Sequence, residues 1–260
     1  MKKVFLIKLE DLKEPNECLD FIADNCEVVD NPRRADGFVS IGGDGTLLGA
    51  VREYKQYKKP FFGFHFGSDD FSDGFMLNPI DGQTLKEFSE QKMYTEEIPM
   101  LEVEMFDTKG NKLETQYAFG DCYFKDYLGG IIHTKLSIND KVKFESIDSD
   151  GVLVCTSAGS TAYNASAKGV ILPLDSADMV VTAICPKPLY RWHSTILSKR
   201  ETVELEPKNT GRRPAKFWLD GQVVEGVARV RVSQSDRVVK LCFADSYDFR
   251  QKVLNLQFGS

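Results

Sequence analysis

The first 95 residues alternate between short apolar runs and segments in which apolar residues recur every three or four positions. Three runs have the length and composition of buried strands: Val4–Leu9, Asp36–Ile41 and Pro60–Phe66. Three segments have the spacing of amphipathic helices: Asn16–Asn25, Thr46–Tyr57 and Gly82–Lys92. Strands that alternate with helices in this way predict a parallel sheet with crossover helices, a Rossmann-like three-layer α/β domain.

The pattern changes near Glu96, after which short segments of alternating apolar and polar residues dominate. Met100–Asp107 and Lys112–Phe124 flank a turn and predict a hairpin, and similar pairs follow them. The second part is therefore expected to be an antiparallel β-sandwich. Within it, Ser160–Val170 has helical spacing, and Asp245–Phe258 returns to helical spacing at the end of the chain.

These patterns predict two domains in the 260 residues. The α/β domain takes residues 1–95 and is completed by a C-terminal helix, 246–260, that packs back on it. The β-sandwich domain takes residues 96–245.

Composition excludes several classes of partner. The chain has 33 basic and 39 acidic residues, a net charge of −6, whereas nucleic acid and anionic membranes attract a basic surface. The apolar runs are all shorter than the ~18 residues of a membrane span, and Lys8 interrupts the first, which we interpret as a strand and not a signal peptide. Six cysteines without C-x-x-C spacing indicate free thiols in a reducing compartment, so we expect a cytoplasmic protein.

A glycine-rich loop follows the second predicted strand. Gly42, Gly43 and Gly45 surround Asp44 and precede a predicted helix, an arrangement that presents backbone N–H groups to phosphate at the positive end of the helix. An ordinary turn with Asp44 as helix N-cap would have the same spacing. A carboxylate beside phosphates needs an intervening cation or a hydroxyl proton to accept. Asp44 should therefore bind Mg²⁺ or deprotonate an attacking alcohol, and both roles point to phosphoryl transfer.

The second stretch that could carry chemistry is Thr156–Tyr163, in which a turn after a buried strand, Thr156–Ser160, leads into a predicted helix start at Thr161. It offers four Ser and Thr hydroxyls and a glycine, but a Ser/Thr helix cap would account for them too. The order A-G-S-T-A lacks the second glycine of a hydrolase nucleophile elbow. The three histidines, at positions 65, 133 and 193, are interpreted as structural.

Together the two stretches resemble the hallmarks of the NAD kinase family, which uses ATP or polyphosphate. Gly42–Thr46 reads G-G-D-G-T, and Thr156–Tyr163 reads T-S-A-G-S-T-A-Y where the family has T-P-[ST]-G-[ST]-T-A-Y. Lipid kinases share the first motif and lack the second. Ser149–Gly151 (S-D-G) and Leu219–Gln222 (L-D-G-Q) extend the resemblance over most of the chain.

The resemblance implies a role for each matching residue. Asp44 would activate the adenosine-ribose 2′-hydroxyl of NAD as general base. Phosphates would be cradled by Gly42, Gly43, Gly45 and Thr46. The NAD-binding residues would be Phe75, Asp121, Asp150, Thr161, Ala162, Tyr163, Ser166 and Asp220. Mg²⁺ or another divalent cation would accompany ATP, and no protein metal site is expected.

The chain departs from the family at three places. Gly120 stands where an Asn that reads adenine is usual, although Asp121 keeps the neighbouring carboxylate. Ser157 and Ala158 replace a proline and a hydroxyl residue. The acidic stretch from Gly67 to Gly74 is longer than the family's usual loop.

The resemblance thus implies an NAD kinase, which would phosphorylate NAD to NADP with ATP or polyphosphate. Two alternatives stay open. A kinase of the same superfamily could act on another nucleotide or a lipid hydroxyl, which Gly120 would favour. A non-catalytic dinucleotide-binding protein would gain nothing from Asp44. The resemblance also implies a homodimer or homotetramer assembled through the β domain, with Tyr190 and Arg191 near a subunit contact.

Overall fold

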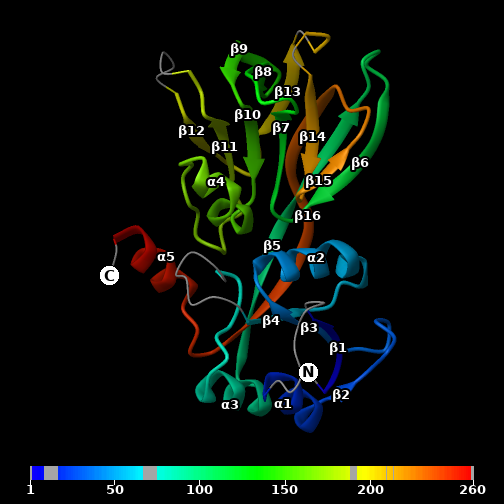
Figure 1. Ribbon diagram of the computed structural model, residues 1–260, viewed down its shortest axis with the longest axis vertical. Helices are drawn as coiled ribbons and strands as arrows, with labels where there is room; N and C mark the ends of the chain where they lie inside the picture. Colours follow the sequence, from blue (N-terminus) through cyan, green and yellow to red (C-terminus); the bar gives the residue numbers. More distant parts are fainter. Residues whose placement is uncertain are drawn as a thin grey trace. The chain divides into compact units, whose positions relative to one another are not determined.

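The computed structural model describes residues 2–8, 17–66, 75–187, 192–208, 210–212 and 214–258. Two compact units make up the chain, one formed by Met1–Glu97 with Val239–Ser260 (unit 1) and one by Ile98–Val238 (unit 2) (Figure 1). The chain therefore passes from one unit to the other within β5 (Met93–Phe106) and again within β16 (Arg229–Ala244). The acidic stretch 67–74 and the expected contact residues Tyr190 and Arg191 lie outside the described residues.

Unit 1 is built on a parallel sheet. Its strands are β1 (Lys3–Lys8), β2 (Glu27–Val28), β3 (Gly37–Gly42) and β4 (Phe61–His65), in the order β2-β1-β3-β4. The end of β16 continues this sheet, because Leu241 and Cys242 pair in parallel with Phe61 and Phe62 of β4. The last strand of the chain thus contributes to the sheet that begins it, which places the second division between the units at residue 238 rather than in the loop after 244.

Helices cover both faces of that sheet. Helices α1 (Glu17–Asn25) and α3 (Gly82–Glu90) pack Ile22 and Phe88 against Val39 and Ile41 of β3. On the other face Tyr54 of α2 (Asp44–Tyr54) stacks on Phe38, with ring centroids 5.2 Å apart. A 3₁₀ turn, η1 (Lys55–Tyr57), closes α2. The residues of β3 alternate between the two faces, as a strand dictates, and the predicted three-layer α/β arrangement is confirmed.

Unit 2 contains two sheets that are antiparallel at every strand pair with a recorded register. One sheet contains β6 (Lys112–Ala118), β8 (Ile132–Ile138), β9 (Lys141–Ser149) and β13 (Thr202–Lys208), together with parts of β5 and β16. The other has the order β12-β11-β10-β7-β14-β15. Its strands are β7 (Asp121–Asp126), β10 (Gly151–Cys155), β11 (Met179–Ile184), β12 (Ser194–Leu197), β14 (Ala215–Leu219) and β15 (Gln222–Val224).

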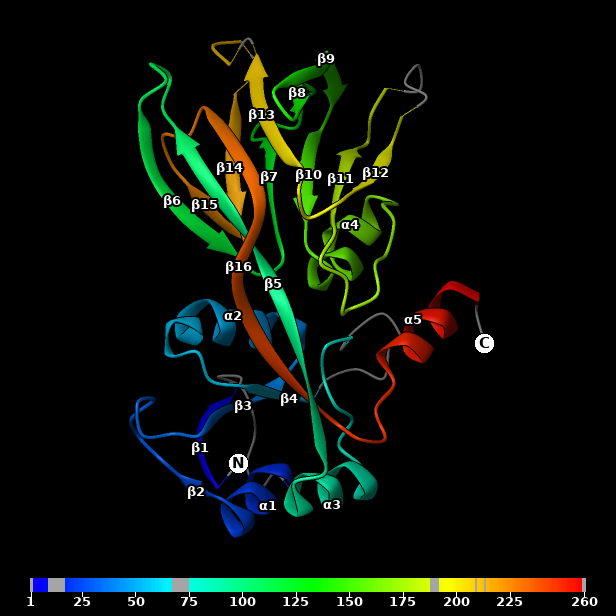
Figure 2. The same cartoon turned by 180° about the vertical axis from the view of Figure 1, so that it is seen from behind.

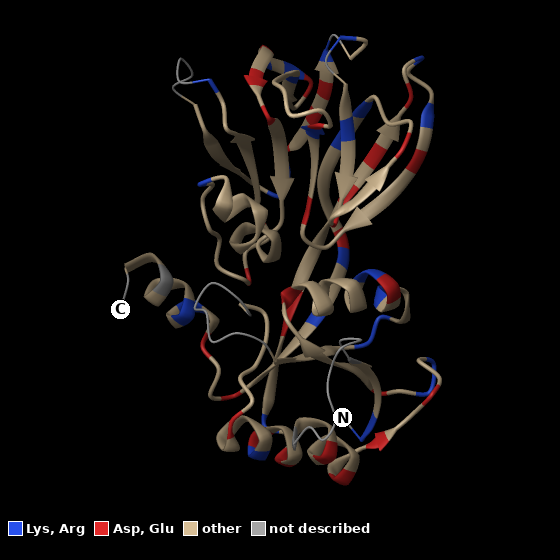
Figure 3. Cartoon of the chain, viewed as in Figure 1, with Lys and Arg blue, Asp and Glu red and all other residues tan. Residues whose placement is uncertain are grey.

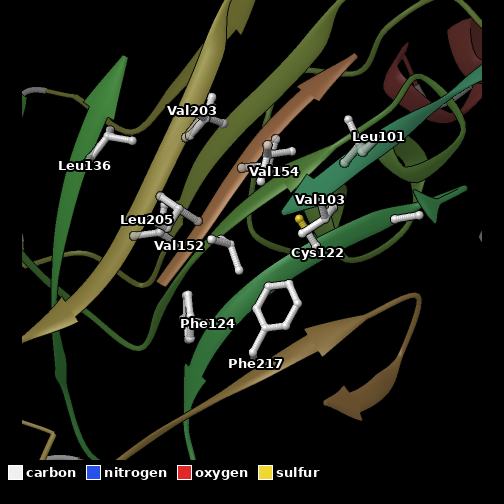
Figure 4. Packing of buried hydrophobic residues seen from close by; sticks show 14 of the residues in the cluster. Leu101, Val103, Cys122, Phe124, Leu136, Val152, Val154, Val203, Leu205 and Phe217 are labelled. Carbon is white, nitrogen blue, oxygen red and sulfur yellow. The ribbon is translucent and has the colours of Figure 1, made fainter. Parts of the chain in front are cut away.

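The apolar core of unit 2 lies between these two sheets. Leu101 and Val203 from the first sheet share a buried cluster with Phe124, Val154 and Phe217 from the second (Figure 4). The alternate residues of β7 that face away from this core are Asp121, Tyr123 and Lys125, whereas Leu153 and Cys155 of β10 belong to a second apolar cluster. The predicted β-sandwich is confirmed.

Two local predictions were wrong. Ser160–Val170 does not form a continuous helix, because it holds only the end of η2 (Ala158–Thr161) and the four-residue α4 (Tyr163–Ser166). Lys168 in the left-handed region, at φ 60°, ends that short helix. Lys112–Phe124 is not one strand either. The strand is interrupted at Phe119 and Gly120, and the two strands on either side, β6 and β7, join different sheets. The tail forms α5 (Phe249–Phe258) as its spacing indicates (Figure 2).

The predictions from composition can be compared with the described surface. Acidic and basic residues are mixed along the described helices and strands of each unit (Figure 3). All six cysteines are free thiols, and four of them, Cys18, Cys122, Cys155 and Cys242, are buried. In the part of the chain that the structure describes, no helix combines the length and hydropathy of a membrane span.

Candidate active site

The glycine-rich loop of unit 1 joins β3 to α2. Gly43 is the helix N-cap, with extended backbone angles and no side-chain cap, and Asp44 is the first residue of the helix. Asp44 is therefore not the N-cap. The alternative to a phosphate loop, an ordinary turn capped by Asp44, does not apply. Gly42 has φ +154°, and an added Cβ would overlap Oγ1 of Thr46 and lie 2.9 Å from its Cβ. Gly42 is thus required by the packing of the loop itself.

Gly43 and Gly45 differ from Gly42, because an added Cβ at either position meets no atom within 4 Å. The packing of the described residues does not explain why these two positions are glycine. Gly43 is half-buried and Gly45 is exposed, at the positive end of an eleven-residue helix. A side chain there would fill the space through which an anion reaches the backbone N–H groups, so the loop can seat phosphate.

The Asp44 carboxylate is held by two backbone amides. The Phe75 N–H donates to Oδ2 at 3.2 Å, and the Met76 N–H donates to Oδ1 at 3.3 Å. Asp44 is half-buried, whereas Phe75 is only 2 % exposed. An acid in the first turn of α2 also interacts favourably with the helix dipole. Asp44, the phosphate loop and Phe75 therefore come together within unit 1.

The second glycine-containing turn, in unit 2, is built differently. The hydroxyls of Thr156, Ser157 and Ser160 are at most 1 % exposed, and each donates to a backbone carbonyl. Asn164 of α4 adds bonds to the carbonyls of Ser160 and Val170. These side chains shape the turn and are not aimed at a ligand. Thr161 is half-buried and Ala162 and Ser166 are exposed, which leaves them at the surface of the turn.

Asp220 organises the backbone that precedes β7. It lies in the left-handed region, at φ 47°, in the tight turn between β14 and β15, and is 2 % exposed. Its carboxylate accepts the N–H groups of Phe119 at 2.9 Å, Gly120 at 2.7 Å and Asp121 at 3.3 Å. Because these three charge-assisted bonds are buried, they hold the backbone of residues 119–121 in place between β6 and β7. We call this arrangement the Asp220 clasp.

Asp121 lies beside this clasp and is 8 % exposed. Burial, together with the neighbouring Asp220 carboxylate, raises the pKa of Asp121 to about 7. A carboxyl that titrates near neutrality in a site can either donate or accept a hydrogen bond, which suits contact with a sugar hydroxyl.

Gly120 has no backbone group left for a base. Its N–H donates to Asp220, and its carbonyl accepts the N–H of Thr156 at 2.9 Å and the hydroxyl of the same residue at 3.3 Å. Gly159 packs directly on it, since an added Cβ at Gly159 would overlap the Gly120 carbonyl oxygen and lie 2.6 Å from its carbon. The backbone of Gly120 therefore does not replace the missing amide side chain.

Sequence reasoning missed the partners of Tyr163. The Tyr163 ring packs edge-on against Tyr123, which in turn stacks on Trp218 with ring centroids 5.9 Å apart. The Lys125 ammonium lies 5.2 Å from the centre of the Tyr163 ring. Its hydrogen bond to Tyr163, with a smaller contribution from Asp150, raises the pKa of Lys125. The period of two along β7 places Asp121, Tyr123 and Lys125 on one face, and that alternation was the available signal.

The histidines do not form a catalytic triad with the hydroxyls of the turn. His133 bonds Asp148 through Nδ1 at 2.6 Å, and His193 contacts the carbonyl of Ala167 through Nε2 at 2.7 Å. Lys187 and then His133 lower the pKa of Asp148 to about 2. Within the described ranges, no group of three or more His, Cys, Asp or Glu side chains could hold a metal ion.

Comparison with known protein sequences gives one match to the second part of the chain and several matches over most of its length. The ATP-NAD kinase C-terminal domain family matches residues 121–242. The NAD kinase of Rickettsia africae (strain ESF-5) is 32% identical over 226 residues, which covers 86% of this chain and 86% of that protein. The NAD kinase of Rickettsia prowazekii (strain Madrid E) is 31% identical over 229 residues, with the same coverage of both chains.

Solved structures share the fold over nearly the whole chain. Yeast NADH kinase complexed with NADH superposes with a TM-score of 0.82 at 18% identity, covering 100% of this chain and 88% of that one. An NAD kinase from Archaeoglobus fulgidus in complex with ATP gives a TM-score of 0.73 at 19% identity, covering 99% of this chain and 97% of that one.

Proposed function

Because this chain belongs to the NAD kinase family and is a phosphotransferase acting on an alcohol group, we propose that it phosphorylates the adenosine-ribose 2′-hydroxyl of NAD with ATP, with Asp44 as general base. One observation carries the assignment of the base. Asp44 is the acidic residue in the first turn of α2, beside two glycines that leave space for phosphate, and two amides orient its carboxylate.

The donor phosphates would lie on the loop Gly42–Thr46. The helix dipole and the N–H groups of its first turn favour an anion there, and the absence of side chains at Gly43 and Gly45 permits close approach. The open space at these two positions supports this assignment over a packing role.

The residues proposed to bind the dinucleotide belong mainly to unit 2. Asp121 would contact a ribose hydroxyl, because a carboxyl with a pKa near 7 exchanges a proton easily at physiological pH. Tyr163 presents an aromatic ring beside Lys125, whose pKa Asp150 also raises, and this suits contact with a base or ribose of the dinucleotide, with Asp150 on the nicotinamide side. Thr161, Ala162 and Ser166 are proposed to line the same surface, and Phe75 of unit 1 to wall the adenine. Asp220 would act through its clasp on residues 119–121.

Mg²⁺, or another divalent cation, would accompany ATP. Its preferred environment combines substrate phosphates and water with at most one or two carboxylates. The phosphates of ATP on the loop Gly42–Thr46 would hold the ion, which leaves Asp44 to act as the base. When bound, such an ion neutralises charge on the transferred phosphoryl group.

The test of the proposed reaction is direct. Purified protein is incubated with NAD, ATP and Mg²⁺, and NADP is quantified for the wild type and for Asp44→Asn. General-base removal should lower kcat by about 10²–10⁴-fold with little change in the dissociation constant of NAD. A wild type that forms no NADP from NAD with either ATP or polyphosphate, and no NADPH from NADH, would refute the reaction. An Asp44→Asn enzyme of normal kcat would refute the base.

We also propose a homodimer or homotetramer in the cytoplasm. Ile196 lies on β12, an edge strand of its sheet, and is 47 % exposed, which is an apolar position that a second copy could cover. Six free thiols fit a reducing compartment. Sedimentation at several concentrations measures the assembly, and a concentration-independent monomer would contradict it.

A further inference from the structure

The C-terminal segment, Asp245–Phe258, follows β16 and contains α5 (Figure 2). Several polar contacts bind it to the body of unit 1. The Glu87 carboxylate accepts the N–H of Ser246 at 3.0 Å and its hydroxyl at 2.8 Å. The Tyr94 hydroxyl donates to the carbonyl of Tyr247 at 3.0 Å. These bonds fix the start of the segment independently of the Tyr247 side chain.

Tyr247 is fixed in turn by its ring and its hydroxyl. The ring stacks on Phe243, with centroids 5.0 Å apart and planes within 10° of each other. The hydroxyl donates a short hydrogen bond to the carbonyl oxygen of Phe75. Burial, with a smaller contribution from the Asp44 charge, raises the pKa of Tyr247 well above its usual value, so the hydroxyl remains a donor.

The peptide unit between Phe75 and Met76 connects this hydroxyl to Asp44. Its carbonyl accepts from Tyr247, and its N–H, which belongs to Met76, donates to Oδ1 of Asp44 at 3.3 Å. Because a peptide unit is planar, a bond that fixes the carbonyl also fixes the direction of the N–H on the opposite side. A hydrogen bond to the carbonyl also polarises the unit and strengthens its N–H as a donor.

We infer that Tyr247 is a positioning residue for Asp44, acting through the Phe75–Met76 peptide unit to hold the carboxylate in its reactive direction. The inference rests on the proposed role of Asp44 as the base. It extends the active site to the C-terminal segment, which sequence motifs did not connect with the chemistry.

Lys252 of α5 contributes a second contact to the same place. Its ammonium lies 5.4 Å from the centre of the Phe75 ring, within the range of a cation–π interaction. The ring of Phe75 and its carbonyl are therefore both contacted by the C-terminal segment.

The experiment compares Tyr247→Phe with Tyr94→Phe and Asp44→Asn in the full-length protein. Tyr247→Phe removes one oxygen and keeps the ring stack. It should lower kcat about tenfold, as misplacement of a catalytic group does, while KM for NAD and for ATP stays within about twofold. Tyr94→Phe removes a hydroxyl bond to the same segment without touching the Phe75–Met76 unit, so its kcat should equal that of the wild type.

Thermal unfolding of each variant separates positioning from stability. Tyr247→Phe and Tyr94→Phe each lose one hydroxyl bond and should show similar shifts in Tm, so a lower kcat for Tyr247→Phe alone supports the inference. All rates are measured well below the lowest Tm of the set. A normal kcat for Tyr247→Phe, or equal losses of kcat in both tyrosine variants, would overturn it. A normal kcat for Asp44→Asn would instead overturn the proposed base.

Discussion

The two glycine-containing turns look alike in sequence and differ in structure. In the loop Gly42–Thr46 of unit 1, an added Cβ at Gly43 or Gly45 meets no neighbouring atom. In the turn Thr156–Ser166 of unit 2, the Cβ of an added side chain at Gly159 overlaps the backbone of Gly120. The first turn leaves space beside its backbone at Gly43 and Gly45, whereas the second leaves none at Gly159.

The polar groups of the two turns differ in the same way. No side chain caps the first turn of α2 among the described residues. The hydroxyls of Thr156, Ser157 and Ser160, in contrast, are buried and bonded to carbonyls. Serines and threonines in a motif can thus form a rigid turn. Gly43 and Gly45, in contrast, leave the backbone open at the start of a helix, where an anion is favoured.

The carboxylates complete the comparison. Asp220 is buried and accepts three backbone N–H groups, which leaves it a structural role. Asp44 is half-buried and accepts two amides at 3.2 and 3.3 Å, bonds longer than the usual ~2.9 Å of N–H···O. The Asp44 carboxylate is thus oriented by backbone N–H groups at a half-buried position, whereas Asp220 is fully enclosed.

The largest expected effect tests whether Gly159 is a packing glycine. Gly159→Ala places a methyl group against the carbonyl of Gly120, and neither backbone segment can move without breaking the bonds of Thr156 and Asp220. We expect the free energy of unfolding to fall by about 5 kcal/mol, at the upper end of single substitutions. Denaturant unfolding measures this, and a loss below about 1 kcal/mol would remove the contrast between the turns.

The next effect concerns Asp121 and pH. The unfolded chain should release the Asp121 proton near pKa 3.8 and the folded protein near 7. Between these values the folded protein holds a proton that the unfolded chain has lost, so the free energy of unfolding falls as pH rises from 4 to 7. This contribution of the Asp121 proton to the free energy of unfolding is fully present below pH 4 and lost above pH 7.

Asp121→Asn removes this titration. At about 1.36 kcal/mol per pKa unit, the variant should be more stable than the wild type by about 4 kcal/mol at pH 8 and should show little difference at pH 4. Urea unfolding at both pH values measures the two differences. Equal differences at pH 4 and pH 8 would mean that Asp121 keeps its ordinary pKa.

A slightly smaller effect is expected for Asp220→Ala. The substitution leaves three buried N–H groups, those of residues 119–121, without their acceptor, and puts alanine, which adopts the left-handed region less readily than Asp, at φ 47°. We expect a loss of about 3 kcal/mol, reduced by relief of repulsion with Asp121. Asp220→Asn tolerates the backbone angle and keeps one acceptor, so it should lose about half as much by the same measurement. Equal losses in both variants would place the cost in the lost carboxylate charge and not in the backbone angle.

The sequence predicted the elements better than the contacts between them. Apolar spacing of two and of three to four residues identified the strands and helices of unit 1 and the alternating strands of unit 2. The helix expected at Ser160–Val170 was wrong because Asn164 bonds the carbonyls of Ser160 and Val170, and such side-chain bonds replace helical ones.

The least predictable features join residues far apart in the chain. The contact of Gly159 with Gly120, the bonds of Asp220 to residues 119–121 and the bond of Tyr247 to Phe75 link segments that share no local pattern. The hydroxyls of Thr156, Ser157 and Ser160, which all donate to backbone carbonyls, have the same origin. The sequence shows which side chains can donate a hydrogen bond, but only the fold shows which acceptors lie near them. The motif located Asp44, whereas Tyr247 required the fold.

The smallest expected effect on stability gives a sharp test of the open turn. Gly45→Ala adds a methyl group where no described atom lies within 4 Å, in the first turn of a helix, so the free energy of unfolding should rise by about 0.5 kcal/mol. If the loop seats phosphate, the same methyl group occupies the space that ATP needs, and KM for ATP should rise about tenfold, or 1.4 kcal/mol. Gly49→Ala, in the middle of α2 and equally free of neighbours, should show the small gain in stability with an unchanged KM. A normal KM for ATP in both variants would show that the space at Gly45 is not the phosphate seat.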